Sequence, residues 1–184
     1  YCTKKGTVKK TALSQYSNPR TTGIKAIKIE EDDELMDVQV TAGNNDIVLA
    51  TRHGLSVRFH ESDVREMGRD TTGVKGVELR PSDQVVGMVV IVVTEKGLGK
   101  CSEVSEYRVQ KRGGKGILTL NRTAKTGDVV ALMEVVPEDE LMLMTRQGIA
   151  IRSKVSEIRV TGRAAQGVKL VALDDNDVVS AVAR

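Results

Sequence analysis

Aromatic residues are almost missing from this 184-residue chain, which has no Trp, one Phe and three Tyr. A pocket lined with aromatic rings is therefore not expected, nor is stacking on nucleic-acid bases as the main mode of binding. Two cysteines, Cys2 and Cys101, are too few for a disulfide framework and are typical of a reducing cytoplasm. Because no run of 18 or more apolar residues occurs, no transmembrane helix is expected. The segment that opens at Tyr1 has no signal-peptide core, and its abrupt start indicates an excised fragment.

Residue groups that usually hold a metal or carry catalysis are missing as well. His53 and His60 have no Cys or carboxylate partners at metal-ligand spacing. The segment Gly97-Leu98-Gly99-Lys100 resembles part of a phosphate-binding loop, but Thr94 replaces the first glycine of that pattern and Cys101 replaces its Ser or Thr. No Ser-His-Asp grouping or nucleophile elbow is present. The sequence therefore predicts no metal, no cofactor and no catalytic residue in this chain.

An internal repeat dominates what the sequence does contain. The motif Thr-x-x-Gly occurs four times, beginning at Thr3, Thr51, Thr94 and Thr145. A second glycine follows each motif glycine after 17 to 19 residues, and these second glycines are Gly23, Gly73, Gly116 and Gly167. A pitch near 50 residues is typical of propellers and other arrays of repeated units.

Each repeat has the apolar pattern of strands. Runs such as Ile47-Val48-Leu49-Ala50 and Leu141-Met142-Leu143-Met144 are short and lie between turn residues. An apolar residue lies ten positions after each motif glycine, at Tyr16, Val64, Tyr107 and Ile158. Helical stripes of useful length are absent. The pattern predicts one all-β domain over residues 1–184, a propeller-like disc with four blades. We place the repeats at about 1–31, 32–81, 82–126 and 127–173, with 174–184 starting or closing a further blade.

Two irregularities interrupt the repeat. The spacing between successive second glycines is 50, then 43, then 51 residues, and the shortfall falls near Val90-Ile91. Either this blade has a shorter hairpin or a loop is missing from the sequence, and we favour the missing loop. The chain also opens in the second half of a repeat. Its two ends could therefore pair to close a ring, or further blades could lie upstream.

Charge is strongly segregated along the chain, although the net charge is only +3. We define four arms, each running from a Thr-x-x-Gly motif to the following second-glycine region: residues 3–28, 51–75, 94–116 and 145–169. These arms hold 24 of the 28 Lys and Arg but only 8 of the 25 Asp and Glu. The arms therefore sum to +16 and the rest of the chain to −13. One basic arm per blade predicts a basic stripe along one side of the disc, suited to a polyanion bound through its backbone.

Several segments resemble the C-terminal domain of the DNA gyrase A protein. They are Gly6-Thr7-Val8-Lys9-Lys10-Thr11, Val57-Arg58-Phe59, residues 67–76 and Val160-Thr161-Gly162-Arg163, and the similarity runs from end to end. The resemblance implies a β-pinwheel that binds and bends duplex DNA without sequence specificity. In that family, wrapping supports ATP-dependent negative supercoiling by the whole gyrase, so ATP and Mg²⁺ would be used elsewhere in the enzyme. It also implies three partners (duplex DNA, the rest of the gyrase A protein, and the gyrase B protein), and a cytoplasmic, nucleoid-associated, bacterial location. We expect the fragment itself to be monomeric and away from membranes.

Residues 110–116 are similar to the signature heptapeptide of this family, the gyrase A box, although the family usually carries it in the first blade. Its glycines let the backbone approach phosphates closely. With this loop, the basic positions of the arms form the predicted DNA contacts. These contacts are Lys4, Lys5, Lys9, Lys10, Arg20, Lys25, Arg52, Arg58, Arg69, Lys75, Lys100, Gln110, Lys111, Arg112, Gly113, Gly114, Lys115, Gly116, Arg152, Lys154, Arg163 and Lys169.

Other interpretations of the basic residues remain open. The repeated arginines at 20, 69, 112 and 163 could bind phosphates or could tie loops together. Lys10, Arg58 and Arg152 share one repeat position, which Cys101 occupies in the third repeat, so that blade should hold DNA less strongly. The alternative functions are the equivalent domain of topoisomerase IV, which directs substrate choice, and a propeller that binds proteins rather than DNA.

Overall fold

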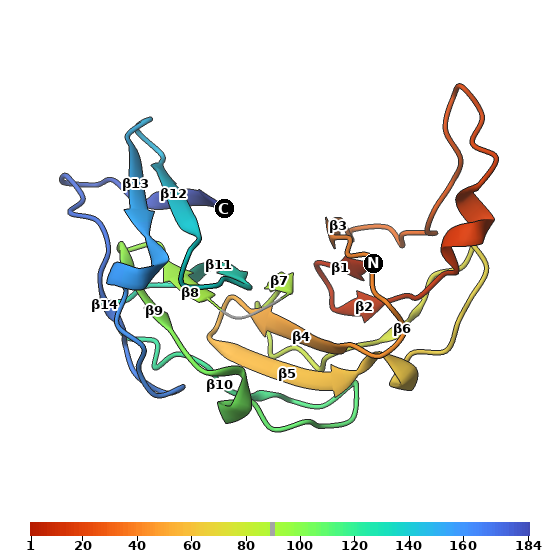
Figure 1. Ribbon diagram of the computed structural model, residues 1–184, viewed down its shortest axis with the longest axis horizontal. Coiled ribbons are helices and arrows are strands. Elements are labelled where there is room, and N and C mark those ends of the chain that lie inside the picture. Colours follow the sequence, from red (N-terminus) through yellow and green to blue (C-terminus); the bar gives the residue numbers. More distant parts are fainter. Residues whose placement is uncertain (89–90) are drawn as a thin grey trace.

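The computed structural model describes residues 1–88 and 91–184. These residues form fifteen strands and four 3-10 helices of one turn, and the strands make four sheets that follow one another around an open arc (Figure 1). The prediction of an all-β, propeller-like chain with four blades is therefore confirmed. None of the described helices is long or apolar enough to cross a membrane. The irregularity predicted near Val90-Ile91 adjoins residues 89–90, which lie outside the described residues.

We number the four sheets as blades 1 to 4 along the chain. Blade 1 has the strand order β3 (Leu35–Asp37), β1 (Cys2–Thr3), β2 (Thr7–Val8) and β6 (Val74–Lys75). Blade 2 has β7 (Val85–Met88), β4 (Asp46–Thr51), β5 (Leu55–His60) and β10 (Ile117–Leu118). Blade 3 has β11 (Val129–Met133), β8 (Ile91–Thr94), β9 (Leu98–Cys101) and β14 (Val168–Lys169). Blade 4 has β15 (Val179–Ala183), β12 (Glu140–Thr145) and β13 (Ala150–Lys154).

The Thr-x-x-Gly motif forms the hairpin turn at the centre of every blade. In blade 2, the N–H of Gly54 donates to the Thr51 carbonyl at 2.9 Å, and the Thr51 hydroxyl accepts from the N–H of Leu55 at 3.3 Å. The same pair of hydrogen bonds recurs at the other three motifs. The motif glycines have φ between +74° and +87°, a region that other residues rarely adopt. Thr closes the turn and Gly permits its backbone, which explains why both recur.

The second glycine of each repeat permits an exchange of strands between blades. β6 pairs with β2, β10 with β5 and β14 with β9. Each of these two-residue strands lies at the end of an arm, or directly after it in the case of β10, and supplies the fourth strand of the preceding blade. A Cβ on Gly73, Gly116 or Gly167 would lie only 2.5–2.7 Å from a backbone carbonyl oxygen of the accepting strand. No residue larger than glycine fits so close an approach, and the exchange therefore depends on these three glycines.

The hairpin of every blade leads into a 3-10 helix on the outer edge of the arc (Figure 1). These helices are η1 (Leu13–Tyr16), η2 (Glu61–Asp63), η3 (Val104–Glu106) and η4 (Val155–Glu157). The apolar position predicted from the repeat lies at or just after the end of each helix. Val64, Tyr107 and Ile158 are buried there, whereas Tyr16 is half-buried. In blades 2, 3 and 4 the burial of this one side chain fixes where the chain leaves the 3-10 helix and enters the second half of the arm.

The apolar core is divided among the junctions between blades. One cluster joins blades 1 and 2 and includes the buried side chains of Cys2, Leu49 and Phe59. A second joins blades 2 and 3 around Ala50 and Val92, and a third joins blades 3 and 4. Each blade is therefore stabilised mainly by its neighbours, as in other repeat proteins.

The sequence repeats are offset from the blades. β3 lies within the predicted repeat 32–81 but pairs with β1, and β11 lies within repeat 127–173 but pairs with β8. Residues 174–184 were expected to start or close a further blade. Instead β15 pairs with β12 as the third strand of blade 4. The expectation was wrong because each blade takes one strand from the segment that follows its own hairpin and 3-10 helix.

Blade 4 has no exchanged strand among the described residues, which leaves the outer side of β13 open. A Cβ on Gly148 would have nothing within 4 Å, whereas Gly6, Gly54 and Gly97 are covered by a donated segment. The donating position of the first arm is equally uncovered, since a Cβ on Gly23 also meets nothing within 4 Å. The two ends of the chain lie apart across the opening of the arc (Figure 1), so the ends do not pair to close a ring, which was one of the two alternatives that the sequence left open.

The open side of β13 should be visible in hydrogen exchange. Because the N–H of Thr145 donates to the Ile149 carbonyl at 2.9 Å, the next residue, Ala150, directs its N–H away from β12. Ser56, at the equivalent place in blade 2, pairs instead with β10. We expect the Ala150 amide to have a protection factor roughly fivefold or more below that of Ser56, since one hydrogen bond contributes about 1 kcal/mol. Equal protection, measured by NMR, would show that β13 is covered in solution.

Candidate nucleic-acid interface

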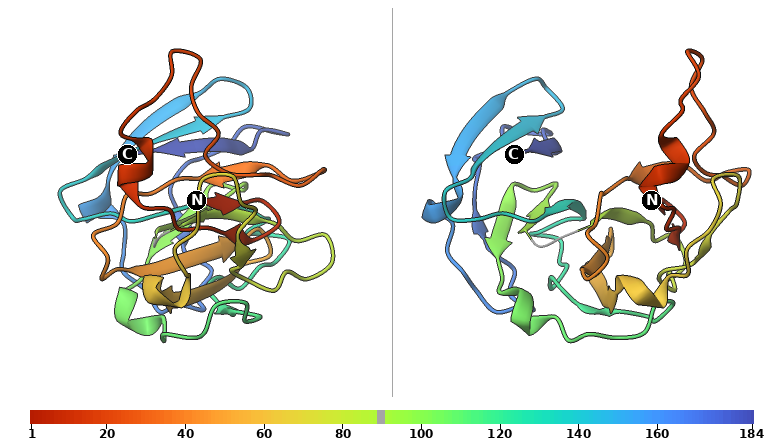
Figure 2. Two further views of the ribbon diagram at one scale, coloured as in Figure 1. Left: turned by 90° about the vertical axis from the view of Figure 1, so that its right-hand side faces the viewer. Right: turned by 45° about the vertical axis from the view of Figure 1, so that its right-hand side comes forward.

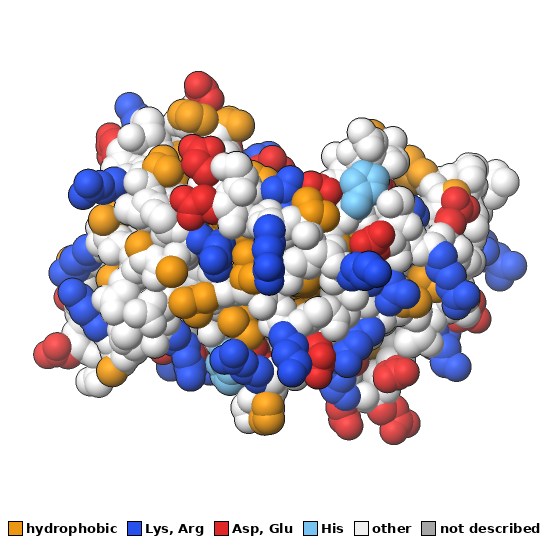
Figure 3. Space-filling view, turned by 90° about the horizontal axis from the view of Figure 1, so that it is seen from below, with side chains coloured by type: hydrophobic (Ala, Val, Ile, Leu, Met, Phe, Trp, Pro, Cys, Tyr) orange, Lys and Arg blue, Asp and Glu red, His pale blue; other side chains and the backbone are white. Residues whose placement is uncertain are grey.

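The basic arms run along the outer side of the arc. Figure 3 views this side and shows Lys and Arg side chains spread from one end of the molecule to the other, with Asp and Glu between them in places. The right-hand view of Figure 2 shows the parts of the arms that follow η2, η3 and η4 on the outside of the arc. The segregation of charge along the sequence therefore becomes a basic outer edge in space.

The glycine-rich loop at residues 110–116 packs along the arm of blade 2. The N–H of Gly113 donates to the Gly76 carbonyl at 2.6 Å, and the Gly114 carbonyl accepts from the N–H of Glu78 at 2.8 Å. A Cβ on Gly113 would lie 3.9–4.0 Å from the stem of Lys75. The loop therefore brings its own exposed Lys111 and Lys115 beside Lys75 of the preceding arm.

Three of the repeated arginines tie neighbouring arms together. Each donates to the carbonyl two positions after the second glycine of the preceding arm: Arg69 to Lys25 at 3.5 Å, Arg112 to Lys75 at 3.1 Å, and Arg163 to Leu118. Arg112 also donates from Nε to the Asp63 carbonyl at 2.8 Å. These contacts support the loop-tying role that the sequence left open. A guanidinium has five donors, so each of these arginines keeps some for a further ligand.

Lys9 and Lys100 are corrections to the predicted set, because both are buried. Lys9 is 3% exposed, and its ammonium donates to the carbonyls of Ala26, at 2.6 Å, and Arg69. Lys100 is fully buried and donates to Gly162, at 3.0 Å, and Arg163. Ammonium groups held among carbonyls below the surface cannot reach a phosphate. Their function in the fold is to fasten the next arm to the blade.

The repeat position four residues after the motif glycine is also largely occupied within the protein. Arg58 donates through Nε and Nη2 to Asp46, at 2.9 and 2.5 Å, and through Nη1 to two carbonyls of the next arm. Lys10 donates to the Glu61 carbonyl at 3.0 Å, and Arg152 pairs with Glu140. Arg58 therefore has most of its donors engaged and is a second correction, from DNA contact to a link between blades 2 and 3.

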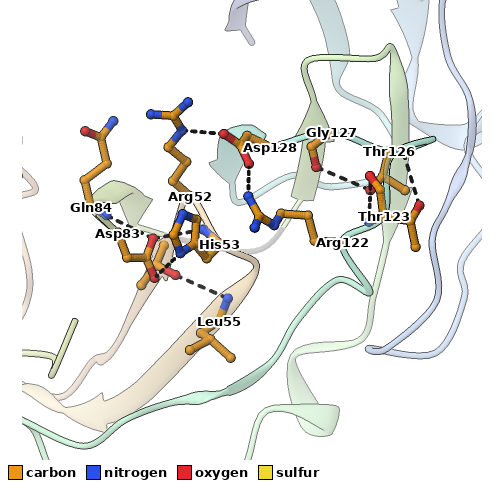
Figure 4. A network of polar contacts seen from close by, with 11 residues as sticks. Arg52, His53, Leu55, Asp83, Gln84, Arg122, Thr123, Thr126, Gly127 and Asp128 are labelled. Carbon is orange, nitrogen blue, oxygen red and sulfur yellow. Dashed lines mark hydrogen bonds and ion pairs between the residues drawn. The ribbon is translucent and has the colours of Figure 1, made fainter. Parts of the chain in front are cut away.

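Arg52 shares one carboxylate with a residue outside the arms. Its Nε donates to Asp128 at 2.6 Å, and Nη1 of Arg122 donates to the other oxygen at 2.5 Å (Figure 4). Burial alone would raise the pKa of Asp128, but the two guanidinium groups outweigh it and hold the pKa below its usual range. The positive charge of Arg52 is thus partly neutralised.

Several of the remaining predicted cations make surface contacts with oxygen atoms. Lys4 lies 3.2 Å from Glu34, Lys25 lies 3.0 Å from Asp70, and Lys5 donates to the Glu31 carbonyl at 3.2 Å. Exposed ion pairs contribute only about 0–1 kcal/mol, so Lys4 and Lys25 can exchange a carboxylate for a phosphate at little cost.

Six predicted cations are exposed and make no side-chain hydrogen bond or ion pair with any described residue. They are Arg20, Lys75, Lys111, Lys115, Lys154 and Lys169. They come from all four arms, which distributes free positive charge around the whole arc.

Three of the exposed arginines that were absent from the predicted set share one repeat position. Arg65, Arg108 and Arg159 lie eleven residues after the motif glycines of blades 2, 3 and 4, directly after the buried Val64, Tyr107 and Ile158. The repeat alignment already contained the signal, since a residue beside a buried one in extended backbone points the opposite way.

Known proteins resemble this chain in both sequence and structure. It matches the family described as DNA gyrase C-terminal domain, beta-propeller, in four copies over residues 2–42, 45–91, 89–136 and 139–184. It is 46% identical to the DNA gyrase A protein of Staphylococcus aureus, an alignment that covers all of this chain but only 22% of that relative. Two solved structures are also similar, and both alignments cover 98% of this chain. The C-terminal domain of DNA topoisomerase IV has TM-score 0.92 and 28% identity over 59% of its length, and the DNA gyrase A C-terminal domain has 0.87 and 25% over 63%.

The buried lysine of blade 3 should make stability depend on pH. Burial lowers the pKa of Lys100 from 10.5 to about 8, although Glu106 opposes this shift. Between these two values the unfolded chain binds more protons than the folded one, so the free energy of unfolding rises with pH. Relative to Lys100→Met, we expect the unsubstituted chain to gain on the order of 3 kcal/mol between pH 8 and 10.5 in urea unfolding. The exposed Lys96, substituted by Met, is the control and should give a curve parallel to that of the unsubstituted chain. If Lys100→Met also gave a parallel curve, folding would not lower the pKa of Lys100.

Proposed function

The chain belongs to the DNA gyrase C-terminal domain family, and from this premise we propose that it binds and bends duplex DNA around its basic outer edge without reading sequence. In the proposed setting it is a non-catalytic part of gyrase, joined to the rest of the gyrase A protein and working with the gyrase B protein. The ATP and Mg²⁺ of supercoiling are then used outside this domain. The chain spans 22% of the length of the curated relatives that it matches.

The observation that carries this proposal is the positive charge of the arms together with their position. The arms sum to +16, they lie along the outer side of the arc (Figure 3), and each contributes at least one exposed cation that is unpaired among the described residues. DNA presents a phosphate charge about every 1.7 Å of helix axis, so an extended row of cations matches it better than any compact ligand.

The elements on this surface favour binding to the DNA backbone over reading of bases. Specific reading of the major groove uses an α-helix or a two-stranded ribbon that enters the groove. The described part of the outer edge has 3-10 helices of three or four residues and strands of two. Contacts of Lys and Arg with phosphates position DNA but carry no sequence information. We therefore expect little preference among sequences, beyond their ease of bending.

The curvature of the edge supplies the reason for bending. A duplex that follows successive arms must leave its straight path, and smooth bending of 20–30 base pairs by 40–90° costs about 1–6 kcal/mol. Because six free cations are distributed over four arms, phosphate contacts at each blade can offset that cost as the duplex advances. A row of cations of the same length on a flat surface would bind DNA without bending it.

A second candidate function has one observation in its favour. The topoisomerase IV domain has the higher TM-score of the two solved structures, 0.92 against 0.87. In this alternative the chain binds DNA without wrapping it and directs which DNA substrate the topoisomerase acts on. The sequence relatives favour the gyrase assignment, with 46% identity to the gyrase A protein.

Salt dependence and DNA topology together test the proposal. We expect affinity for linear duplex DNA to fall by about a thousandfold between 50 and 200 mM salt, the effect of roughly six phosphate contacts. Nicked circles ligated in the presence of the chain should carry a shifted linking number, because bent DNA is trapped when the nick is sealed.

The outcomes separate the candidates. Salt-dependent binding without a shift in linking number would favour the topoisomerase IV alternative. Absence of binding at low salt would refute both and leave the basic edge as a solvated surface. Bovine serum albumin in the ligation reaction controls for effects of protein on the ligase.

A further inference from the structure

One exposed arginine lies at each of the three junctions between blades. Arg65 lies where blade 2 meets blade 1, Arg108 where blade 3 meets blade 2, and Arg159 where blade 4 meets blade 3. The equivalent residue of the first arm is Ser17. The number of these arginines therefore equals the number of junctions.

The backbone holds each arginine from both sides. The residue before it is buried, with exposures of 4% for Val64, 0% for Tyr107 and 5% for Ile158. The residue after it forms a β-bridge with the preceding blade: Glu66 with Lys10, Val109 with Arg58, and Val160 with Cys101. The three backbones are thereby fixed in the same way, and the arginine side chains are exposed.

Nothing in the described part of the chain engages these side chains. All three are exposed, and none makes an ion pair or side-chain hydrogen bond with a described residue. Arg58 and Arg112, a few residues away, donate to carbonyls of neighbouring arms. The fold thus uses one set of arginines to join blades and leaves a second set at the same junctions to solvent.

An arginine fixed in this manner is suited to a phosphate. Its planar fork binds two phosphate oxygens at once, and little backbone entropy remains to be lost on binding. A side chain that served only solubility would not need its backbone pinned at the same point in three junctions. Solvation alone also gives no reason for the spacing of one per junction.

We infer that Arg65, Arg108 and Arg159 each contact a DNA phosphate as the duplex crosses from one blade to the next. The inference rests on the proposed function and assigns contacts that the basic loop and the unpaired lysines do not supply. Glu66 follows Arg65, whereas the apolar Val109 and Val160 follow the other two. The contribution of Arg65 is therefore the smallest of the three, since a neighbouring carboxylate repels phosphate.

A triple variant tests the inference through the salt dependence of binding. The slope of log affinity against log salt decreases by about 0.9 per phosphate contact, so R65Q/R108Q/R159Q should lose about 2.7 of the slope of the unsubstituted chain. The matched control is R80Q/K125Q/R184Q, which removes the same charge from exposed positions outside the arms. It should change the slope far less. Far-UV circular dichroism and thermal unfolding of both variants establish that the blades are intact.

A charge-conserving variant separates contact from stability. R65K/R108K/R159K should keep the slope and lose affinity modestly, because Lys retains the charge but not the fork. Equal slopes for the glutamine triple and its control would overturn the inference in favour of net charge alone. An unchanged slope in the glutamine triple, with normal binding by the unsubstituted chain, would overturn the inference and leave the proposed function intact. Failure of the unsubstituted chain to bind would overturn both.

Discussion

The pairing of a two-residue strand at the end of each of the last three arms with the preceding blade is the contact on which the rest of this structure depends. It requires a glycine at Gly73, Gly116 and Gly167, because the accepting carbonyl oxygen lies where a Cβ would be. It brings each arm to the outer edge and holds its basic residues there. It also forces the core to form between blades, since a blade completed by its neighbour cannot bury an apolar face alone. The fold and the distribution of charge thus follow from one kind of contact, the close approach of two backbones at these glycines.

Basic residues have two distinct roles in the arms. Lys9, Lys100 and Arg58 are enclosed by carbonyls and carboxylates and join neighbouring blades. Lys75, Lys111 and Lys115 remain at the surface without such partners among the described residues. The first role costs desolvation, as the lowered pKa of Lys100 indicates, and is compensated by hydrogen bonds to backbone oxygen. The two roles occur within one short segment, so the positive charge of an arm is larger than the charge that it presents at the surface.

The repeat was sufficient to predict the class of fold, because Thr-x-x-Gly and the second glycine mark turns and close approaches that have few other solutions. It was also sufficient to place the charge on the arms. The burial of Lys9 and Lys100 was not predictable, since each donates to a carbonyl about sixty residues away and any residue type supplies a carbonyl. The limits of the blades were misplaced because a donated strand belongs to one repeat by its place in the sequence and to a different blade by its pairing. Arg65, Arg108 and Arg159 were missed because the repeat spacing identifies inward-facing residues, and these arginines are the outward-facing neighbours of such residues.

The exchange of strands also sets an order in which this chain can be completed during synthesis. The last strand of blade 1 pairs Val8 with Val74, so the first blade lacks its outer strand until the arm of the second has been made. The same holds for Ser56 with Ile117 and for Gly99 with Val168. Pairings across so many residues carry a high entropic cost of loop closure and form slowly. As the chain leaves the ribosome, each nascent blade is thus finished by the next, and a pause within an arm would leave the preceding blade with an uncovered edge.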